Sequence, residues 1–164
     1  MSISRSDPEL FARTSEKQVR ECLSVLYTRM KEDRMVGFLF EGKPLEAIVE
    51  GQVQLVCAVL GAPGFASYQG RSLPEAHREL PLLPGHFDRR HELLREALAA
   101  VGVDEKVNAA WLEADTAWRR AILNSGEFAR ERARNAQDSV AGASDAPSAS
   151  PSPSASSKAP PTGK

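Results

Sequence analysis

Residues 44–60 read PLEAIVEGQVQLVCAVL, and this stretch carries the helical pattern on which the fold class rests. Proline suits the first turn of a helix, and apolar residues then recur at intervals of three and four. The stripe consists of Leu45, Ile48, Leu55, Val56 and Val59, with Gln52 in its middle. The pattern predicts a helix from Pro44 to Leu60, which ends before the glycines and proline of residues 61–64.

The segments on either side show the same spacing. Ser15 and Gln18 fit a capping box, and a helical stripe follows them, made of Val19, Leu23, Leu26, Tyr27 and Met30. Ser72 and Glu75 fit a second capping box, which opens a short helix closed by Pro81 and Pro84.

Two long helices complete the pattern. The first ends at Gly102 and turns inward Phe87, His91, Leu94, Leu98 and Val101. The second begins after Asp104, ends before Gly126 and turns inward Val107, Trp111, Ala114, Trp118 and Ile122. Since no segment alternates with the period of a strand, the sequence predicts an all-α domain.

Composition limits the classes of function. The 164 residues suffice for one domain, over residues 1–136, and the Ser-, Ala- and Pro-rich residues 137–164 are expected to form a disordered tail. A net charge of −1 gives no reason to expect nucleic acid as a partner. No apolar run has the length of a signal peptide core or a membrane span, so a cytoplasmic protein is expected. Cys22 and Cys57 are then reduced core thiols.

Three polar residues do not suit a plain helical bundle. Gln52 interrupts an apolar stripe, the Tyr27 hydroxyl lies on another, and His77 lies on the short helix. Taken singly, each has an ordinary interpretation: a glutamine that reaches solvent, a tyrosine bonded to a backbone carbonyl, and a surface histidine. Taken together, they are the groups that a haem pocket requires, with one axial imidazole and two polar groups on the ligand side. The Arg89-Arg90 pair is interpreted as solvated helix surface.

The order of several motifs resembles the group I truncated hemoglobins, a family of short globins with a two-over-two helical sandwich. The resemblance covers roughly residues 25–103, through LYTRMKEDRMVGFLFEG (26–42), LGAPGFASYQGRSLPEAHREL (60–80) and PGHFDRRHELLREALAAVGV (84–103). The sequence departs from the family in having no glycine within residues 1–24, where members have a short helix and a Gly-Gly turn. It also has Leu55 and Val56 where the family often has two aromatic residues.

The resemblance implies haem b as the cofactor and a specific set of site residues. His77 falls on the proximal iron ligand, Tyr27 on the distal tyrosine, and Ile48 and Gln52 on the distal-helix positions that face the bound ligand. The haem pocket would be completed by Phe40, Phe87, Tyr68, Leu55, Val56, Leu82, Arg71 and Arg78. The two arginines and Tyr68 are placed to contact the propionates.

The function implied by the resemblance is reversible binding of a diatomic gas, O₂, NO or CO. The family also permits oxidation of NO to nitrate, which would require a separate reductase because the chain contains no flavin domain. The sequence leaves O₂ storage, NO oxidation and gas sensing open. The alternative is a haem-free helical interaction module that retains the globin fold.

Overall fold

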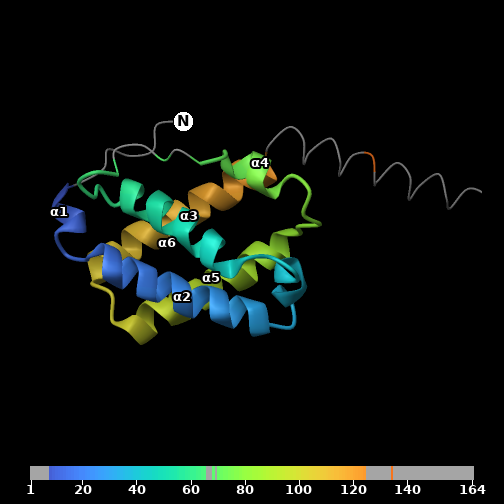
Figure 1. Cartoon of the computed structure of the whole chain (residues 1–164), viewed down its shortest axis with the longest axis horizontal. Coiled ribbons are helices and arrows are strands. Elements are labelled where there is room, and N and C mark those ends of the chain that lie inside the picture. Colours follow the sequence, from blue (N-terminus) through green and yellow to red (C-terminus); the bar gives the residue numbers. More distant parts are fainter. Residues whose placement is uncertain (1–7, 66–67, 69, 125–133, 135–164) are drawn as a thin grey trace, which may run out of the picture. The chain divides into compact units, whose positions relative to one another are not determined.

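The computed structural model describes residues 8–65, 68, 70–124 and 134, and it is helical apart from turns over these residues (Figure 1). The helices are α1 (Pro8–Phe11), α2 (Glu16–Glu32), the 3-10 helix η1 (Gly37–Phe40), α3 (Leu45–Val59), α4 (Leu73–His77), α5 (Pro84–Val101) and α6 (Glu105–Leu123). The predicted all-α class and each predicted long helix are confirmed. The tail expected over residues 137–164 and the stop at Gly126 lie outside the described residues.

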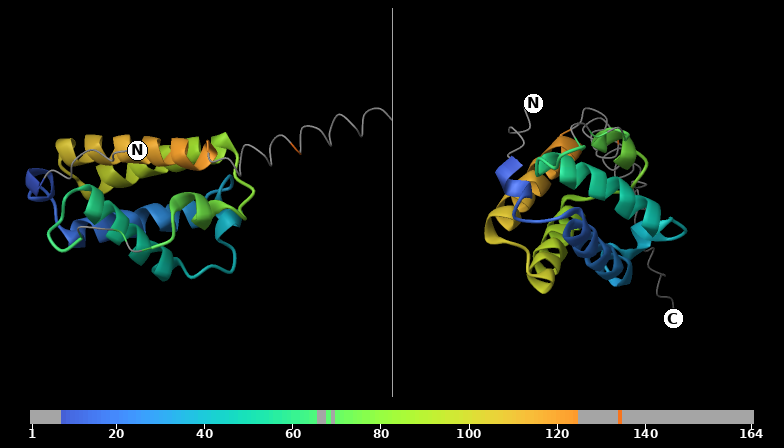
Figure 2. Two further views of the ribbon diagram at one scale, coloured as in Figure 1. Left: turned by 90° about the horizontal axis from the view of Figure 1, so that it is seen from above. Right: turned by 60° about the vertical axis from the view of Figure 1, so that its left-hand side comes forward.

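The four long helices form two layers (Figure 2). Helix α2 packs against α3 in one layer and α5 packs against α6 in the other, while contacts between α2 and α5 join the layers. The apolar stripe of α2 lies at their centre, and its buried members are Val19, Cys22, Leu23, Leu26, Tyr27 and Met30. The structure therefore has the expected two-over-two arrangement.

The helix starts follow the capping residues found in the sequence. The Ser72 hydroxyl accepts a hydrogen bond from the Glu75 amide, and the Glu75 carboxylate accepts one from the Ser72 amide at 3.1 Å. At the start of α2, only one of the two hydrogen bonds of the predicted Ser15–Gln18 capping box forms. The Ser15 hydroxyl accepts from the Gln18 amide at 3.2 Å, but the Gln18 side chain accepts from the Thr14 hydroxyl. Asp104 caps α6 by accepting from the Lys106 and Val107 amides.

Both cysteines are free thiols in the core. Burial raises the pKa of Cys22 to about 12 and the pKa of Cys57 to about 11. The expectation of core thiols is confirmed for both residues.

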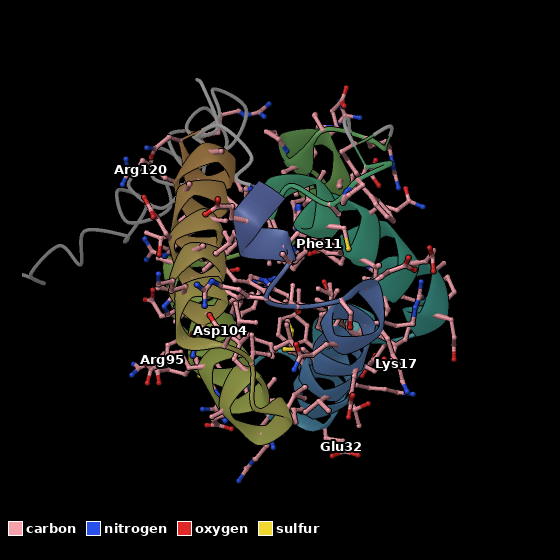
Figure 3. All side chains as sticks on the ribbon, turned by 90° about the vertical axis from the view of Figure 1, so that its left-hand side faces the viewer. Phe11, Lys17, Glu32, Arg95, Asp104 and Arg120 are labelled. Carbon is pink, nitrogen blue, oxygen red and sulfur yellow. The ribbon has the colours of Figure 1, made fainter. Side chains whose placement is uncertain are left out.

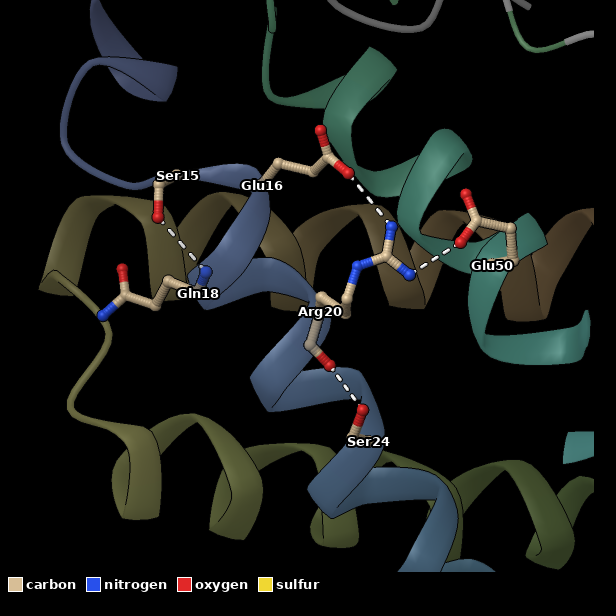
Figure 4. A network of polar contacts seen from close by, with 6 residues as sticks. All are labelled: Ser15, Glu16, Gln18, Arg20, Ser24 and Glu50. Carbon is tan, nitrogen blue, oxygen red and sulfur yellow. Dashed lines mark hydrogen bonds and ion pairs between the residues drawn. The ribbon is translucent and has the colours of Figure 1, made fainter. Parts of the chain in front are cut away.

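Ion pairs between exposed side chains connect neighbouring elements. Arg20 of α2 donates to Glu16, 3.0 Å away, and to Glu50 of α3, 2.6 Å away (Figure 4). Exposed pairs of this kind contribute little to stability because solvent screens them. Figure 3 shows Phe11 on α1 and Asp104 at the start of α6, and Arg13 pairs with Asp104 at 3.5 Å. A short first helix thus contacts α6 although residues 1–24 contain no glycine.

The corner after α2 depends on a glycine, and its replacement should destabilise the fold. A Cβ added to Gly37 would lie 2.6 Å from the backbone oxygen of Lys31, which cannot rotate away. Gly37→Ala is therefore expected to lower the free energy of unfolding by about 1–3 kcal/mol, the usual effect of overpacking. Urea unfolding followed by circular dichroism measures this change.

The matched control is Gly85→Ala in the first turn of α5. A Cβ there would meet only the Met35 methyl group, at an ordinary contact distance of 3.8 Å. Its unfolding free energy should be unchanged or raised, since alanine is the better helix former. Equal losses in both variants would contradict the close approach at Gly37.

Candidate functional site

A cavity of about 520 Å³ opens between the helices. It is bounded by residues of α2, η1, α3, α4 and α5. Most of the residues predicted for the site line it, namely Tyr27, Phe40, Ile48, Gln52, Tyr68, Arg71, His77, Leu82 and Phe87. The two layers, together with the segment around α4, thus bring together residues from distant parts of the sequence.

His77, the last residue of α4, has a defined tautomer. Its Nδ1 lies 2.7 Å from the Leu73 carbonyl oxygen. Since a carbonyl can only accept, Nδ1 carries the hydrogen, and Nε2 carries the lone pair of the neutral ring. Burial lowers the pKa of His77, and the positive charges of Arg90 and Lys43 act in the same direction. The ring is therefore neutral near pH 7 and presents Nε2 as a metal ligand.

Tyr27 and Gln52 supply polar groups from the other layer. Tyr27 is 6% exposed and packs edge-on against Phe40, with their ring centroids 5.7 Å apart. Burial raises the pKa of Tyr27, so the phenol keeps its proton and can donate. Gln52 Oε1 is buried without a hydrogen-bond partner. Gln52 is half-buried and lines the cavity, where its amide oxygen has hydrogen-bonding capacity left unused.

Aromatic and aliphatic side chains form the rest of the wall. Phe87 is buried, and its ring centroid lies 6.4 Å from that of His77. The sequence interpretation did not single out several other lining residues, which are Met30, Val36, Leu39, Ala47, Gly51, Ala76, Leu80 and His86. His86 Nδ1 accepts a hydrogen bond from the Leu83 amide at 3.1 Å. Its Nε2 therefore carries the hydrogen when the ring is neutral, which distinguishes it from His77.

Cations are placed at the exposed part of the cavity. Lys43 and Arg71 are both exposed lining residues, and Lys43 was not predicted from the sequence. The structure does not place Arg78 among the lining residues.

Leu55 and Val56 also lie away from the cavity. They pack within the hydrophobic core at 7% and 1% exposure. The lining positions of α3 are Ala47, Ile48, Gly51 and Gln52, which form one face of the helix nearer its start.

Arg90 is the largest departure from the sequence interpretation. It lines the cavity, and it forms an ion pair with Asp115 of α6, whose side chain is 6% exposed. Asp115 also accepts from His91 Nδ1 at 2.9 Å. The interpretation of Arg90 as solvated surface is wrong, whereas its neighbour Arg89 is 37% exposed and pairs with Asp33. Arg90 follows Phe87 by three residues and precedes Leu94 by four, so helical spacing could have placed it inward.

The described residues also set limits on other sites. They contain no group of three or more His, Cys, Asp or Glu side chains that could hold a metal ion by themselves. None of their helices combines the length and apolar character of a membrane span.

Comparisons with known proteins agree on one family. The model of the family described as bacterial-like globin matches residues 14–124. A group 1 truncated hemoglobin of Tetrahymena thermophila is 25% identical over 104 residues, which cover 63% of this chain and 84% of the relative. A group 1 truncated hemoglobin of Tetrahymena pyriformis is 26% identical over 92 residues, covering 56% and 74%.

A solved structure supports the same fold. The structure of truncated hemoglobin THB11 from Chlamydomonas reinhardtii matches with a TM-score of 0.61 and 19% identity. The match covers 73% of this chain and 99% of that one. At this identity the likeness shows the fold alone.

Proposed function

The chain belongs to the bacterial-like globin family, that of the truncated hemoglobins, and on this premise we propose that it binds haem b in the cavity and a diatomic gas beside it. His77 would hold the haem iron through Nε2. Tyr27 and Gln52 are the proposed hydrogen-bonding partners of the gas, with Ile48 beside them. When bound, the haem iron supplies a coordination position at which O₂, NO or CO binds reversibly.

The observation that carries this proposal is the His77–Leu73 hydrogen bond of 2.7 Å. It fixes the tautomer and leaves a basic nitrogen on a cavity-lining ring that burial keeps neutral. Nε2 is the ring nitrogen that this hydrogen bond leaves to bind a metal. Gln52 also lines the cavity, and its amide nitrogen is the group that could donate a hydrogen bond to the gas.

The remaining lining residues have supporting roles. Phe40, Phe87 and Leu82 exclude water from a largely apolar space, which strengthens any hydrogen bond formed inside it. Lys43 and Arg71, together with Tyr68, are placed to bind the two carboxylates of the haem edge. Arg78, Leu55 and Val56 are not needed for this arrangement.

The two proposed hydrogen-bond donors, Tyr27 and Gln52, bear on the biological role. Two donors to a partly charged gas slow its release, which suits NO oxidation or gas sensing better than O₂ transport. Oxidation of NO to nitrate consumes one O₂ and one electron for each NO. A separate reductase is the proposed source of that electron.

The proposal is tested by adding hemin to the purified full chain. We expect a stoichiometric Soret band for the hemin complex and, after reduction, a further shift of the band under CO. A chain that stays colourless and gives no hemin-dependent spectrum would be the haem-free interaction module instead.

A further inference from the structure

Arg90 combines a position in the cavity wall with a buried counterion behind it. Its side chain is 16% exposed, and that of its partner Asp115 is 6% exposed. The Asp115 carboxylate is held on its other oxygen by His91, so it fixes the guanidinium against the cavity. Buried ion pairs add little net stability compared with apolar residues of similar volume. The pair therefore calls for a role other than stability.

The guanidinium also reaches Tyr27. Arg90 lies within hydrogen-bonding reach of the Tyr27 side chain, where it lowers the pKa of the phenol against the larger rise that burial causes. A guanidinium can only donate, so the phenol oxygen is the acceptor and the phenol hydrogen is free for another acceptor. Arg90 carries five N–H donors, more than Asp115 and Tyr27 use.

The charges around the cavity have one sign. The described lining residues include three cationic side chains, Lys43, Arg71 and Arg90, and no Asp or Glu. Because Lys43 and Arg71 are proposed to pair with the haem carboxylates, Arg90 is the lining cation left to face a ligand. Lys43 and Arg71 are exposed, whereas Arg90 is nearly buried. A cavity of low dielectric that contains fixed positive charge attracts anions more than neutral molecules of the same size.

We propose that Arg90 and Tyr27 form an anion-binding subsite beside the gas-binding position, so that this chain selects small monoanionic ligands such as azide and nitrite. The inference rests on the proposed haem function and adds the ligand class. Both groups donate to the anion, Arg90 through its guanidinium and Tyr27 through the hydroxyl that Arg90 holds in place. Asp115 and His91 act as positioning residues.

The test uses the full chain loaded with hemin. Azide and nitrite are titrated into the ferric protein and CO into the ferrous protein, and each is followed by the Soret band. The main variant is Arg90→Met combined with Asp115→Asn, which removes the pair without leaving a buried carboxylate alone. Asp115→Asn by itself and Arg90→Lys are compared with it. Arg89→Met is the matched control, since Arg89 is the neighbouring arginine and lies outside the cavity.

The variants should show whether the positive charge of Arg90, rather than the shape of its side chain, determines the affinity for anions. The double variant should bind azide and nitrite about 10- to 100-fold more weakly, as expected for loss of a charged hydrogen bond, with CO changed by less than about threefold. Asp115→Asn alone should keep or strengthen anion binding, because the asparagine oxygen can still accept from Arg90 and hold it in place while the guanidinium is less neutralised. Arg90→Lys should be intermediate, and Arg89→Met should match the wild type.

A second measurement does not depend on the gas. The chain has two tyrosines, so in a Tyr68→Phe background the ultraviolet absorbance of tyrosinate reports Tyr27 alone. Loss of Arg90 should raise the pKa of Tyr27 further, because its charge and hydrogen bond now lower that pKa. Arg90→Lys should partly reverse this rise.

The outcomes distinguish failure of the anion subsite from failure of the haem function. A normal hemin complex whose azide and CO affinities fall by the same factor, or whose azide affinity is unchanged, overturns the anion subsite and leaves the haem function standing. An unchanged Tyr27 titration overturns the proposed hold of Arg90 on Tyr27. A wild-type chain that takes up no hemin overturns the haem function and the subsite together.

Discussion

Replacement of His77 by glycine should lower the affinity of the chain for hemin by at least about 100-fold, which corresponds to ~2.7 kcal/mol. The reason is that His77 is the cavity-lining imidazole whose hydrogen bond to Leu73 leaves Nε2 as the basic nitrogen. The rate at which an excess of a haem scavenger removes hemin measures the change. Circular dichroism of the hemin-free variant shows whether the helices are intact.

Added imidazole provides a readout that a purely structural role of His77 would not give. In His77→Gly the small molecule can occupy the vacated space and restore both the Soret band and hemin retention. His86→Ala is the closest control, because His86 also lines the cavity but its Nδ1 accepts from Leu83. His91→Ala is a second control, because it removes a hydrogen bond to Asp115 and His91 does not line the cavity. Hemin loss in His86→Ala, with normal retention in His77→Gly, would show that the ligand has been wrongly assigned.

Replacement of Tyr27 by phenylalanine should speed O₂ release by roughly tenfold or more, as expected for the loss of one hydrogen bond to a charged acceptor. The change removes only a hydroxyl, and the edge-on contact with Phe40 can persist. CO carries less charge on its outer atom, so its release should change much less. Stopped-flow mixing with a competing ligand measures both rates. Equal acceleration of O₂ and CO would instead indicate a steric gate.

The Gln52→Leu variant and the double variant complete the cycle. Because Tyr27 and Gln52 are proposed to act on the same ligand, their effects on O₂ release should not add in free energy. Strict additivity would mean that the two side chains do not share a partner.

Local patterns predicted most of the fold. The Ser72–Glu75 box, the Asp104 cap and the stripe ahead of Met30 all depend on residues close in sequence, and all appear in the structure. The positions of Tyr27 and Gln52 on apolar stripes, with His77 on the short helix, indicated a haem pocket, and the family resemblance assigned each residue its role. The structure places these three around one cavity.

Arg90 shows what local patterns leave out. A charged residue beside Arg89 looks like helix surface until its partner on another helix is known. Asp115 lies four residues after Trp111 on the buried face of α6. The burial of Arg90 and of Asp115 can be understood only once α5 and α6 are packed together, because the two side chains then form an ion pair. Leu55 and Val56 show a limit of the resemblance instead, because the family's pocket positions there correspond in this chain to core residues that do not line the cavity.

The two core thiols have a consequence for chemical durability. Thiolate, rather than thiol, is the form that oxidants and nitrosating agents attack. With a pKa of about 12, Cys22 is ionised in only about one molecule in 10⁵ at pH 7, and Cys57 in about one in 10⁴. Under the proposed gas-binding function, repeated exposure to O₂ or NO should therefore leave both cysteine side chains unmodified.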